Sequence, residues 1–449
     1  MDRDVPPCSF QDLSRLLKPE NFALLGKVDV RELFKKYRPW RKVRAIARAL
    51  QVEPEAAWAT VKLGRMAAWR RLDLQQSNGR EFGISSAPQL IAALHRVDRA
   101  TGGGGAAALH AEDGVLADPA SRYRLRIRTL IDEAAESSLI EGAATTRKDA
   151  VDMLRSGREP RSIGERMVIN NYLAMQQVKR WLQRPLSTDM LLELQTILTE
   201  QTLERPDEAG RLRRSDENVR VVDERDNTDL YTPPLAEALP ARLAALCDFA
   251  NRDHEDEHFI HPIVKASILH FMIGYEHPFV DGNGRTARAV FYWHALRNGY
   301  SIFEYTGISE LIRKGYARYP QAFVDTELDD GDLTYFVLYK LDIIEQALDR
   351  LGEHLRHEEE KVRRSERLLK LAKDLNLRQR LLLEHSLRHP GTQYTVKSHM
   401  NSNGIVAATA RTDLDDLVRR RLMTTTKRGR EVIYLVTSTL AERLAKKGL

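Results

Sequence analysis

The chain has 449 residues, of which 42% are hydrophobic and 30% charged, as in an ordinary folded protein with room for two or three domains. No apolar run approaches the ~18 residues of a membrane span. The first residues lack the apolar stretch of a secretory signal, so we expect a cytoplasmic protein with no membrane partner. The two cysteines, Cys8 and Cys247, are too few for a disulfide framework or a cysteine metal site.

The charge is distributed unevenly. The net charge of the chain is +6, but residues 361–449 contain 20 Lys/Arg against 8 Asp/Glu, so the tail carries +12 and the preceding 360 residues carry −6. A basic C-terminal module on an acidic body predicts that the tail meets an anionic partner.

Residues 1–110 are expected to form a helical N-terminal domain. Aromatic and cationic residues alternate over 34–44, one helix follows over 45–52, and a second is expected to run through Trp58 and Trp69. A helix-turn-helix that touches nucleic acid would have this pattern, but a small helical domain with a basic surface is the commoner arrangement. Residues 101–108 contain four successive glycines and have the composition of a linker, without the lysine spacing of a P-loop.

A second domain is expected over residues 115–350. Apolar residues at helical spacing predict a helix from Ser121 to Glu141, with Gly142 placed to end it. Further helices are predicted over 162–183 and 187–203. The segments 218–222 and 228–232 interrupt this pattern and predict a short β-hairpin, after which helices resume from Pro234.

Residues 254–258, His-Glu-Asp-Glu-His, match the zinc-protease pattern His-Glu-x-x-His. In such a site both histidines lie on one face of a regular helix. Here charged residues surround the pattern, Pro262 follows closely, and no third ligand motif is evident. We therefore predict no zinc site, and we expect these histidines and His261 on the surface or in a connector.

The most informative segment runs from His277 to Arg288, His-Pro-Phe-Val-Asp-Gly-Asn-Gly-Arg-Thr-Ala-Arg. Gly282 and Gly284 allow close backbone approach and positive φ, and Asn283 tolerates the same kind of turn. An apolar helical segment follows directly, so free N–H groups and the positive end of the helix would face an anion. The segment predicts a polyphosphate site.

The charged residues of the segment suit the same ligand. Arg285 and Arg288 stand three apart on one helical face, and a guanidinium binds phosphate oxygens in a bidentate manner. Asp281 is a hard oxygen ligand for Mg²⁺, and His277 has the pKa of a general base. The alternative is a helix start with solvated charges and a core histidine. It does not explain why a glycine-rich turn, two arginines, an aspartate and a histidine occur together in this order.

The segment resembles the Fic (Fido-domain) motif, His-Pro-Phe-x-[Asp/Glu]-Gly-Asn-Gly-Arg-x-x-Arg, at every fixed position. The likeness extends over residues 263–276 and 298–300. It implies a mainly α fold, a Fic helical bundle with a small β-hairpin flap, whose core covers about residues 186–346. It also implies a protein adenylyltransferase that uses ATP and Mg²⁺ to transfer AMP to a Ser, Thr or Tyr hydroxyl of a target protein or of itself.

The resemblance assigns roles to individual residues. His277 would be the catalytic base and Asp281 the Mg²⁺ ligand. Tyr319 would border the nucleotide base, although a core or surface tyrosine fits its sequence equally well. The residues implied in nucleotide binding are Asp281, Gly282, Asn283, Gly284, Arg285, Thr286, Ala287, Arg288 and Tyr319. The flap, where a target segment would dock by strand pairing, would include Val219, Arg220, Val221 and Val222.

Residues 137–142, Ser-Ser-Leu-Ile-Glu-Gly, contain a second informative pattern. As plain chemistry they are a serine and a glutamate on adjacent turns near a helix end. They also match the family's inhibitory motif, [Ser/Thr]-x-x-x-Glu-[Gly/Asn], through Ser137, Glu141 and Gly142. The resemblance implies that Glu141 pairs with Arg288 and removes the cation that the γ-phosphate of ATP needs.

The tail, residues 365–449, is expected to form a winged helix-turn-helix domain. Its predicted elements are helices over 377–387 and 405–418, a short element over 394–400, and a hairpin over 423–436. Thr409, Arg411 and Thr412 would reach a DNA groove, and Arg428 and Arg430 would meet phosphates. Such modules also bind proteins, so both partners stay open.

Two other functions remain as alternatives to AMP transfer. One is a DNA-binding transcriptional regulator in which the Fic domain serves as a nucleotide sensor, although a sensor has no need of the base His277. The other is a de-AMPylase on the same fold, with Glu141 positioning a water molecule. Gly284 in the loop fits AMP transfer better than phosphoryl transfer.

Overall fold

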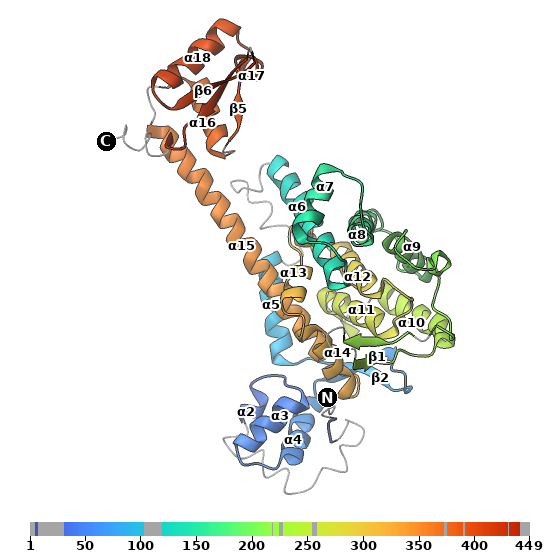
Figure 1. Cartoon of the computed structure of the whole chain (residues 1–449). Coiled ribbons are helices and arrows are strands. Elements are labelled where there is room, and N and C mark those ends of the chain that lie inside the picture. Colours follow the sequence, from blue (N-terminus) through green and yellow to red (C-terminus); the bar gives the residue numbers. More distant parts are fainter. Residues whose placement is uncertain are drawn as a thin grey trace. The chain divides into compact units, whose positions relative to one another are not determined.

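The computed structural model describes residues 5–7, 31–102, 119–217, 219–223, 228–253, 258–371, 375–388, 391–429 and 431–440. It is mainly helical and divides into two compact units, residues 1–351 and 352–449 (Figure 1). The boundary falls within the long helix α15 (Thr334–Leu371). Over the described ranges no helix is both long enough and apolar enough to cross a membrane.

The first unit contains helices from both the predicted N-terminal region and the predicted Fic domain. In chain order its helices before α15 are α2 (Arg31–Phe34), α3 (Trp40–Ala49), α4 (Pro54–Met66), α5 (Pro88–Thr101), α6 (Pro119–Ile140), α7 (Arg147–Ser156), α8 (Ile163–Arg180), α9 (Thr188–Thr199), α10 (Leu239–Asn251), α11 (Pro262–Glu276), α12 (Asn283–Arg297), α13 (Ser309–Lys314) and α14 (Arg318–Leu328). Short 3₁₀ turns lie at η5 (Pro206–Glu208), η6 (Ala236–Ala238) and η8 (Ser301–Glu304).

Helices α11 and α12 form the centre of this unit and lie against each other, with α6, α8, α9 and α10 around them (Figure 1). Almost every side chain of both helices is buried, and a helix that is apolar on all sides is stable only inside a protein. Pro262 does not interrupt α11 but begins it, at the first-turn position that proline favours. The loop between α11 and α12 is the predicted phosphate segment.

The inhibitory-motif helix, α6, is fixed to this core by buried carboxylates. Glu133 accepts hydrogen bonds from the Ser309 backbone N–H (3.0 Å) and hydroxyl (2.5 Å). Glu136 pairs with Arg313 and Arg147, at 2.5 and 3.0 Å. The sequence did not predict α7, which follows α6 and has a Thr146 N-cap.

The N-terminal residues differ from the prediction in two ways. The helix expected to include Trp69 ends at Met66, and Trp69 begins β1 (Trp69–Gln75), which pairs antiparallel with β2 (Glu81–Ser85). The predicted separate domain also belongs to the first compact unit. Lys62 and Asp329, both buried, form an ion pair of 2.5 Å between α4 and the turn before α15, and such long-range contacts cannot be seen in a local sequence pattern.

The predicted flap hairpin is present but shorter than expected. Its strands are β3 (Val221–Asp223) and β4 (Thr228–Tyr231), paired antiparallel with an irregularity between Val221 and Val222. Val219 and Arg220 precede the first strand.

The second unit contains the predicted tail helices and hairpin. After α15 come α16 (Leu377–Arg388), β5 (Gln393–Tyr394), α17 (Val396–Asn403), α18 (Ala407–Arg419), β6 (Met423–Arg428) and β7 (Glu431–Val436). The strands form one sheet in the order β5-β7-β6. Leu383, Leu414 and Leu417 are fully buried within the unit's hydrophobic core. Arg430 lies outside the described residues.

Candidate active site

The loop between α11 and α12 begins at His277, whose backbone is left-handed (φ 44°, ψ 57°) and ends α11. A non-glycine residue in this conformation is uncommon and is typical of functional sites. Arg213 holds the turn in place, because its Nε donates to the His277 carbonyl (2.8 Å) and its backbone N–H donates to the Pro278 carbonyl (2.9 Å). Arg213 was not predicted as a site residue, since nothing in its local sequence indicates that it reaches this loop.

His277 has the geometry and protonation of a base. Its Nδ1 lies 3.3 Å from the Gly274 carbonyl oxygen, which can only accept, so Nδ1 carries the hydrogen and Nε2 keeps its lone pair. Burial lowers the pKa of His277 below its usual value, although the Gly274 hydrogen bond and the nearby Glu141 charge oppose the shift. The imidazole is therefore neutral at neutral pH.

The glycine-rich turn is closed by side chains of its own and of α9. Asn283 Oδ1 accepts from the Phe279 N–H (3.0 Å) and its Nδ2 donates to the Phe279 carbonyl (2.9 Å). Gly282 has φ 90°, which favours glycine. The buried Gln195 on α9 donates to the Asp281 carbonyl (3.3 Å). Asn283 thus shapes the loop with its side chain, which leaves its backbone and that of Gly284 for an anion.

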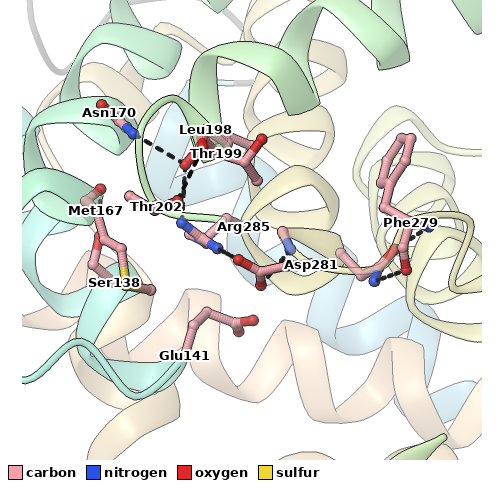
Figure 2. A network of polar contacts seen from close by, with 12 residues as sticks. Ser138, Glu141, Met167, Asn170, Leu198, Thr199, Thr202, Phe279, Asp281 and Arg285 are labelled. Carbon is pink, nitrogen blue, oxygen red and sulfur yellow. Dashed lines mark hydrogen bonds and ion pairs between the residues drawn. The ribbon is translucent and has the colours of Figure 1, made fainter. Parts of the chain in front are cut away.

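Arg285 is fully buried beneath the loop (Figure 2). Its guanidinium donates to Asp281 Oδ2 at 2.7 Å and to the Leu198 carbonyl at 3.0 Å. The other Asp281 oxygen accepts from the Gly282 N–H at 2.6 Å. Arg285 was predicted to hold phosphates; in the structure its two terminal nitrogens donate to α9 and to the loop, and its buried Nε has no hydrogen-bond partner among the described residues.

Arg288 is also buried, but its partners come from α6. Its Nε donates to Ser137 Oγ (2.7 Å), and one terminal nitrogen, Nη2, donates to the Ser137 carbonyl (2.9 Å) and to Glu141 Oε1 (3.0 Å). The other terminal nitrogen, Nη1, has no hydrogen-bond partner among the described residues. A buried donor without a partner is costly, and an anion placed here would satisfy it.

The Glu141 carboxylate lies directly on the start of α12. A Cβ added to Gly284 would overlap Glu141 Oε1, and it would stand 2.8 Å from both Cδ and Oε2. Gly284 therefore keeps open a space at the helix N-terminus that a carboxylate fills. Backbone N–H groups and the helix dipole favour any anion at this position, so Glu141 stands where a phosphate would bind.

The residues present fit a nucleotide with Mg²⁺. Asp281 is the acidic residue of the loop, and 42% of its side chain is exposed. Mg²⁺ at nucleotide sites is held by one or two carboxylates together with the substrate phosphates. No group of three or more His, Cys, Asp or Glu residues that could hold a metal occurs in the described part of the chain, so phosphate oxygens would have to complete the coordination.

Three further residues were predicted to bind the nucleotide: Thr286, Ala287 and Tyr319. Thr286 and Ala287 are buried in the first turn of α12. The Tyr319 hydroxyl, on α14, lies 2.8 Å from His270 Nε2. Burial raises the pKa of Tyr319, whereas the charge of Arg288 and a side-chain hydrogen bond from it lower that pKa. Of the His-Glu-Asp-Glu-His segment, residues 254–257 lie outside the described residues, and His258 is exposed.

Comparison with known proteins identifies the domain around this loop. Residues 185–295 match the model of the Fic/DOC family. Over these residues the chain is similar to the Fic/DOC family. A protein adenylyltransferase Fic from Nematostella vectensis is 37% identical over 144 residues, which cover 32% of this chain and 29% of the relative. One from Drosophila erecta is 31% identical over 112 residues, 24% of this chain and 21% of the relative. The chain thus spans less than a third of these relatives.

The fold of the Fic domain also extends to solved structures. A Fic family protein from Desulfovibrio desulfuricans G20 superposes with a TM-score of 0.54 at 19% identity, covering 78% of this chain and 96% of that protein. At this identity the likeness establishes the fold and no more. The family match includes the entire loop from His277 to Arg288.

Proposed function

We propose that this protein is a nucleotidyltransferase that moves AMP from ATP to a Ser, Thr or Tyr hydroxyl of a protein, and that Glu141 holds it inactive. The observation that carries the proposal is the position of the Glu141 carboxylate, on the start of α12 and paired with Arg288. A negative group at the predicted phosphate site is expected only if the site is built for an anion. The adenylyltransferase names of relatives with limited coverage support the same chemistry.

In the proposed reaction, His277 Nε2 accepts the proton of the target hydroxyl. The hydroxyl oxygen forms a bond to the α-phosphorus of ATP, the bond from that phosphorus to the oxygen bridging to the β-phosphorus breaks, and pyrophosphate leaves. The neutral state of His277 and its fixed tautomer prepare it for this step. The flap strands β3 and β4 would present the target segment by strand pairing.

The phosphates would bind at the start of α12. Backbone N–H groups at Asn283 and Gly284 would stabilise charge on the phosphate oxygens, and Arg288 would bind the γ-phosphate through the terminal nitrogen that lacks a partner. Asp281 would hold Mg²⁺, which neutralises phosphate charge when bound. Arg285 would act mainly by fixing Asp281, since the two residues are paired. Stacking of Tyr319 on the base stays a prediction.

The test of this proposal is incorporation of label from ATP labelled on the α-phosphate, with purified full-length protein and Mg²⁺. Glu141→Gly should raise self-labelling or labelling of added proteins by at least about tenfold, because it frees the anion site and Arg288. Adding His277→Ala should abolish the labelling. Mass spectrometry should find a gain of one AMP. Equal labelling by the wild-type chain and Glu141→Gly would refute the inhibitory role, and label retained in the double variant would refute the base.

The same variants distinguish AMP removal from AMP transfer. A de-AMPylase that needs Glu141 to position water would lose activity on an AMP-modified protein when Glu141 is changed. Transfer should instead increase. A loss of both activities in Glu141→Gly would favour removal as the main reaction.

A second candidate function, binding of double-stranded DNA by the tail, has an observation of its own. Helix α17 is joined to α18 by a short turn in which Gly404 has φ 61°, and the two form a helix-turn-helix pair. Arg411 and Thr412 on α18 are exposed, as are Lys427 and Arg428 in the hairpin, whereas Thr409 is half-buried. Exposed cations on a helix and on a nearby hairpin suit a groove and its phosphates.

This candidate is tested by anisotropy with a pool of randomised 30-base-pair duplexes and the full chain. Binding should weaken with salt, and Lys427→Ala with Arg428→Ala should reduce the slope of log K against log salt by about one per lost phosphate contact. His277→Ala should leave binding unchanged. Salt-independent or undetectable binding would mean that the module serves a protein partner or none.

A further inference from the structure

A chain of buried polar side chains leads from Arg288 away from the phosphate site. Tyr319 Oη lies 2.8 Å from His270 Nε2, and His270 Nδ1 lies 3.4 Å from Lys340 Nζ. His270 and Lys340 are fully buried. Tyr319 comes from α14, His270 from α11 and Lys340 from α15, so three helices bring the chain together. None of these residues belongs to the loop or to α6.

We propose that Lys340 is a positioning residue for the anion site, and that through His270 it turns the Tyr319 hydroxyl hydrogen toward the anion that Arg288 holds. The role rests on the proposed nucleotide binding for its ligand. It concerns how tightly the site binds an anion and involves no contact between Lys340 and substrate. In the resting protein the anion is the Glu141 carboxylate, and in the active protein it would be a phosphate of ATP.

The direction of the hydrogen bonds follows from the donors available. A protonated Lys340 has only hydrogens to offer, so it donates to His270 Nδ1. His270 is then the tautomer that donates from Nε2 to the Tyr319 oxygen, and the Tyr319 hydrogen is free to point at an anion. A neutral Lys340 can accept instead, which lets the chain reverse: Tyr319 donates to His270, His270 donates to Lys340, and the phenol hydrogen turns away from the site.

The surroundings of Lys340 bring its pKa close to neutral pH. Burial and the charge of Arg288 lower the pKa of Lys340 to about 7, and Glu133 from α6 opposes the shift. The ammonium group also lies 4.2 Å from the centre of the Phe291 ring on α12. Burial, Lys340 and Arg288 lower the pKa of His270 well below its usual value, so the imidazole stays neutral and transmits the change without titrating.

The two ends of the chain are electrostatically connected. Arg288 and Glu141 both influence the pKa of Tyr319, although burial, which raises it, is the largest effect. An anion at Arg288 stabilises a positive charge on Lys340, and by linkage a protonated Lys340 favours the anion. Anion binding should therefore draw a proton onto Lys340.

The experiment measures MgATP binding to Glu141→Gly by calorimetry between pH 6.5 and 8.5. Binding should tighten by about fivefold toward the lower pH, with proton uptake seen as a dependence on the ionisation heat of the buffer. Lys340→Met fixes the neutral state and should bind weakly at all pH values. Lys340→Arg fixes the charged state and should bind tightly at all pH values. Tyr319→Phe should bind weakly and lose most of the pH dependence while Lys340 remains.

Lys265 on α11 provides a matched control. It is a second buried lysine, and burial lowers its pKa to about 8. It donates to the Arg252 carbonyl at 2.6 Å and is not part of the chain from Lys340 to Tyr319. Lys265→Met should leave the pH dependence of binding as it is in Glu141→Gly. If the Lys340 variants keep that pH dependence as well, or if Lys265→Met removes it, the positioning role is wrong.

A ligand-free measurement separates this inference from the proposed function. In the chain with Glu141 in place, the stability lost on Glu141→Gln should be larger at pH 6.5 than at pH 8.5, and this difference should vanish in Lys340→Met. Denaturant unfolding provides the values. If MgATP does not bind at any pH, the proposed function is wrong. The comparison of Glu141→Gln with and without Lys340→Met still tests the positioning role of Lys340.

Discussion

The two arginines of the loop, Arg285 and Arg288, stand three residues apart on the same helix, and both are fully buried, yet they are held in different ways. Arg285 is bound to Asp281, four residues before it, and to Leu198. Arg288 is bound to Ser137 and Glu141, about 150 residues before it and on another helix. Arg285 is therefore held by its own loop and by α9, and Arg288 is held by a separate helix, α6.

This difference separates a structural role from a regulated one. Because the Arg285 partner belongs to the same loop, breaking that pair deforms the loop itself. Because the Arg288 partner belongs to α6, breaking that pair should leave the loop intact and free the cation. The Arg285 and Arg288 variants are compared in the Glu141→Gly background.

The largest effect is expected for Arg285→Ala. It removes a fully buried guanidinium from beneath the loop and one donor each from Asp281 and the Leu198 carbonyl, and the cavity together with the lost hydrogen bonds should cost about 3 kcal/mol. The free energy of unfolding should fall by that amount and AMP transfer should be lost with it. Denaturant unfolding measures the first and label incorporation the second. A variant of unchanged stability would show that the pair does not support the loop.

Arg288→Ala should act on binding more than on stability. Loss of the γ-phosphate contact should lower kcat/KM for AMP transfer by about 50-fold, mostly through KM, as expected for a charged hydrogen bond of 2 to 3 kcal/mol. The unfolding free energy should fall by less than in Arg285→Ala. If the two variants lost equal stability, the contrast between a structural and a regulated arginine would not hold.

Ser137→Ala, made in the chain that retains Glu141, should weaken the hold of α6 on Arg288. One hydrogen bond to a charged group is lost, worth about 1.5 kcal/mol, so basal transfer should rise by at most about tenfold. The increase should remain below that of Glu141→Gly. Initial rates of label incorporation measure it, and a fall in transfer would mean that Ser137 serves the active state instead.

The smallest effect is expected in the pKa of His277. Glu141 raises this pKa while burial, the larger influence, lowers it. Glu141→Gln in the otherwise unchanged chain should therefore lower the pKa further, as followed by NMR of the imidazole. In Glu141→Gly at saturating MgATP, kcat for transfer should stay constant above pH 6.5 and decline only as the pH falls through the lowered pKa, where His277 gains its proton. A rise in the pKa would contradict the position of Glu141.

Local sequence was sufficient for much of the site. The glycines, the asparagine and the charged residues of the loop predicted a phosphate-binding turn that enters a helix, and the apolar segment after the turn predicted that helix. The Ser137 to Gly142 motif also predicted the pair that the structure shows between Glu141 and Arg288. The hairpin was predicted in place but not in length, because short exposed strands have weak propensities.

Contacts between distant residues could not be predicted in this way. Arg213 supports the His277 turn from 64 positions away, and Lys340 meets His270 across 70. Trp69 was predicted to lie in a helix, but its pairing with Ser85 makes it a strand residue. Tertiary pairing overrides local propensity where the two disagree.

The sequence by itself thus predicted a base, a phosphate turn and an inhibitory glutamate that pairs with Arg288, since backbone freedom and side-chain charge are properties of the residues. Only the tertiary structure showed that Arg285 is bound to the Leu198 carbonyl as well as to Asp281, because that depends on where α9 lies. The tertiary structure also brought the buried Lys340 next to His270. Burial and the charges that shift the pKa of Lys340 arise only when helices α6, α11, α12, α14 and α15 pack together.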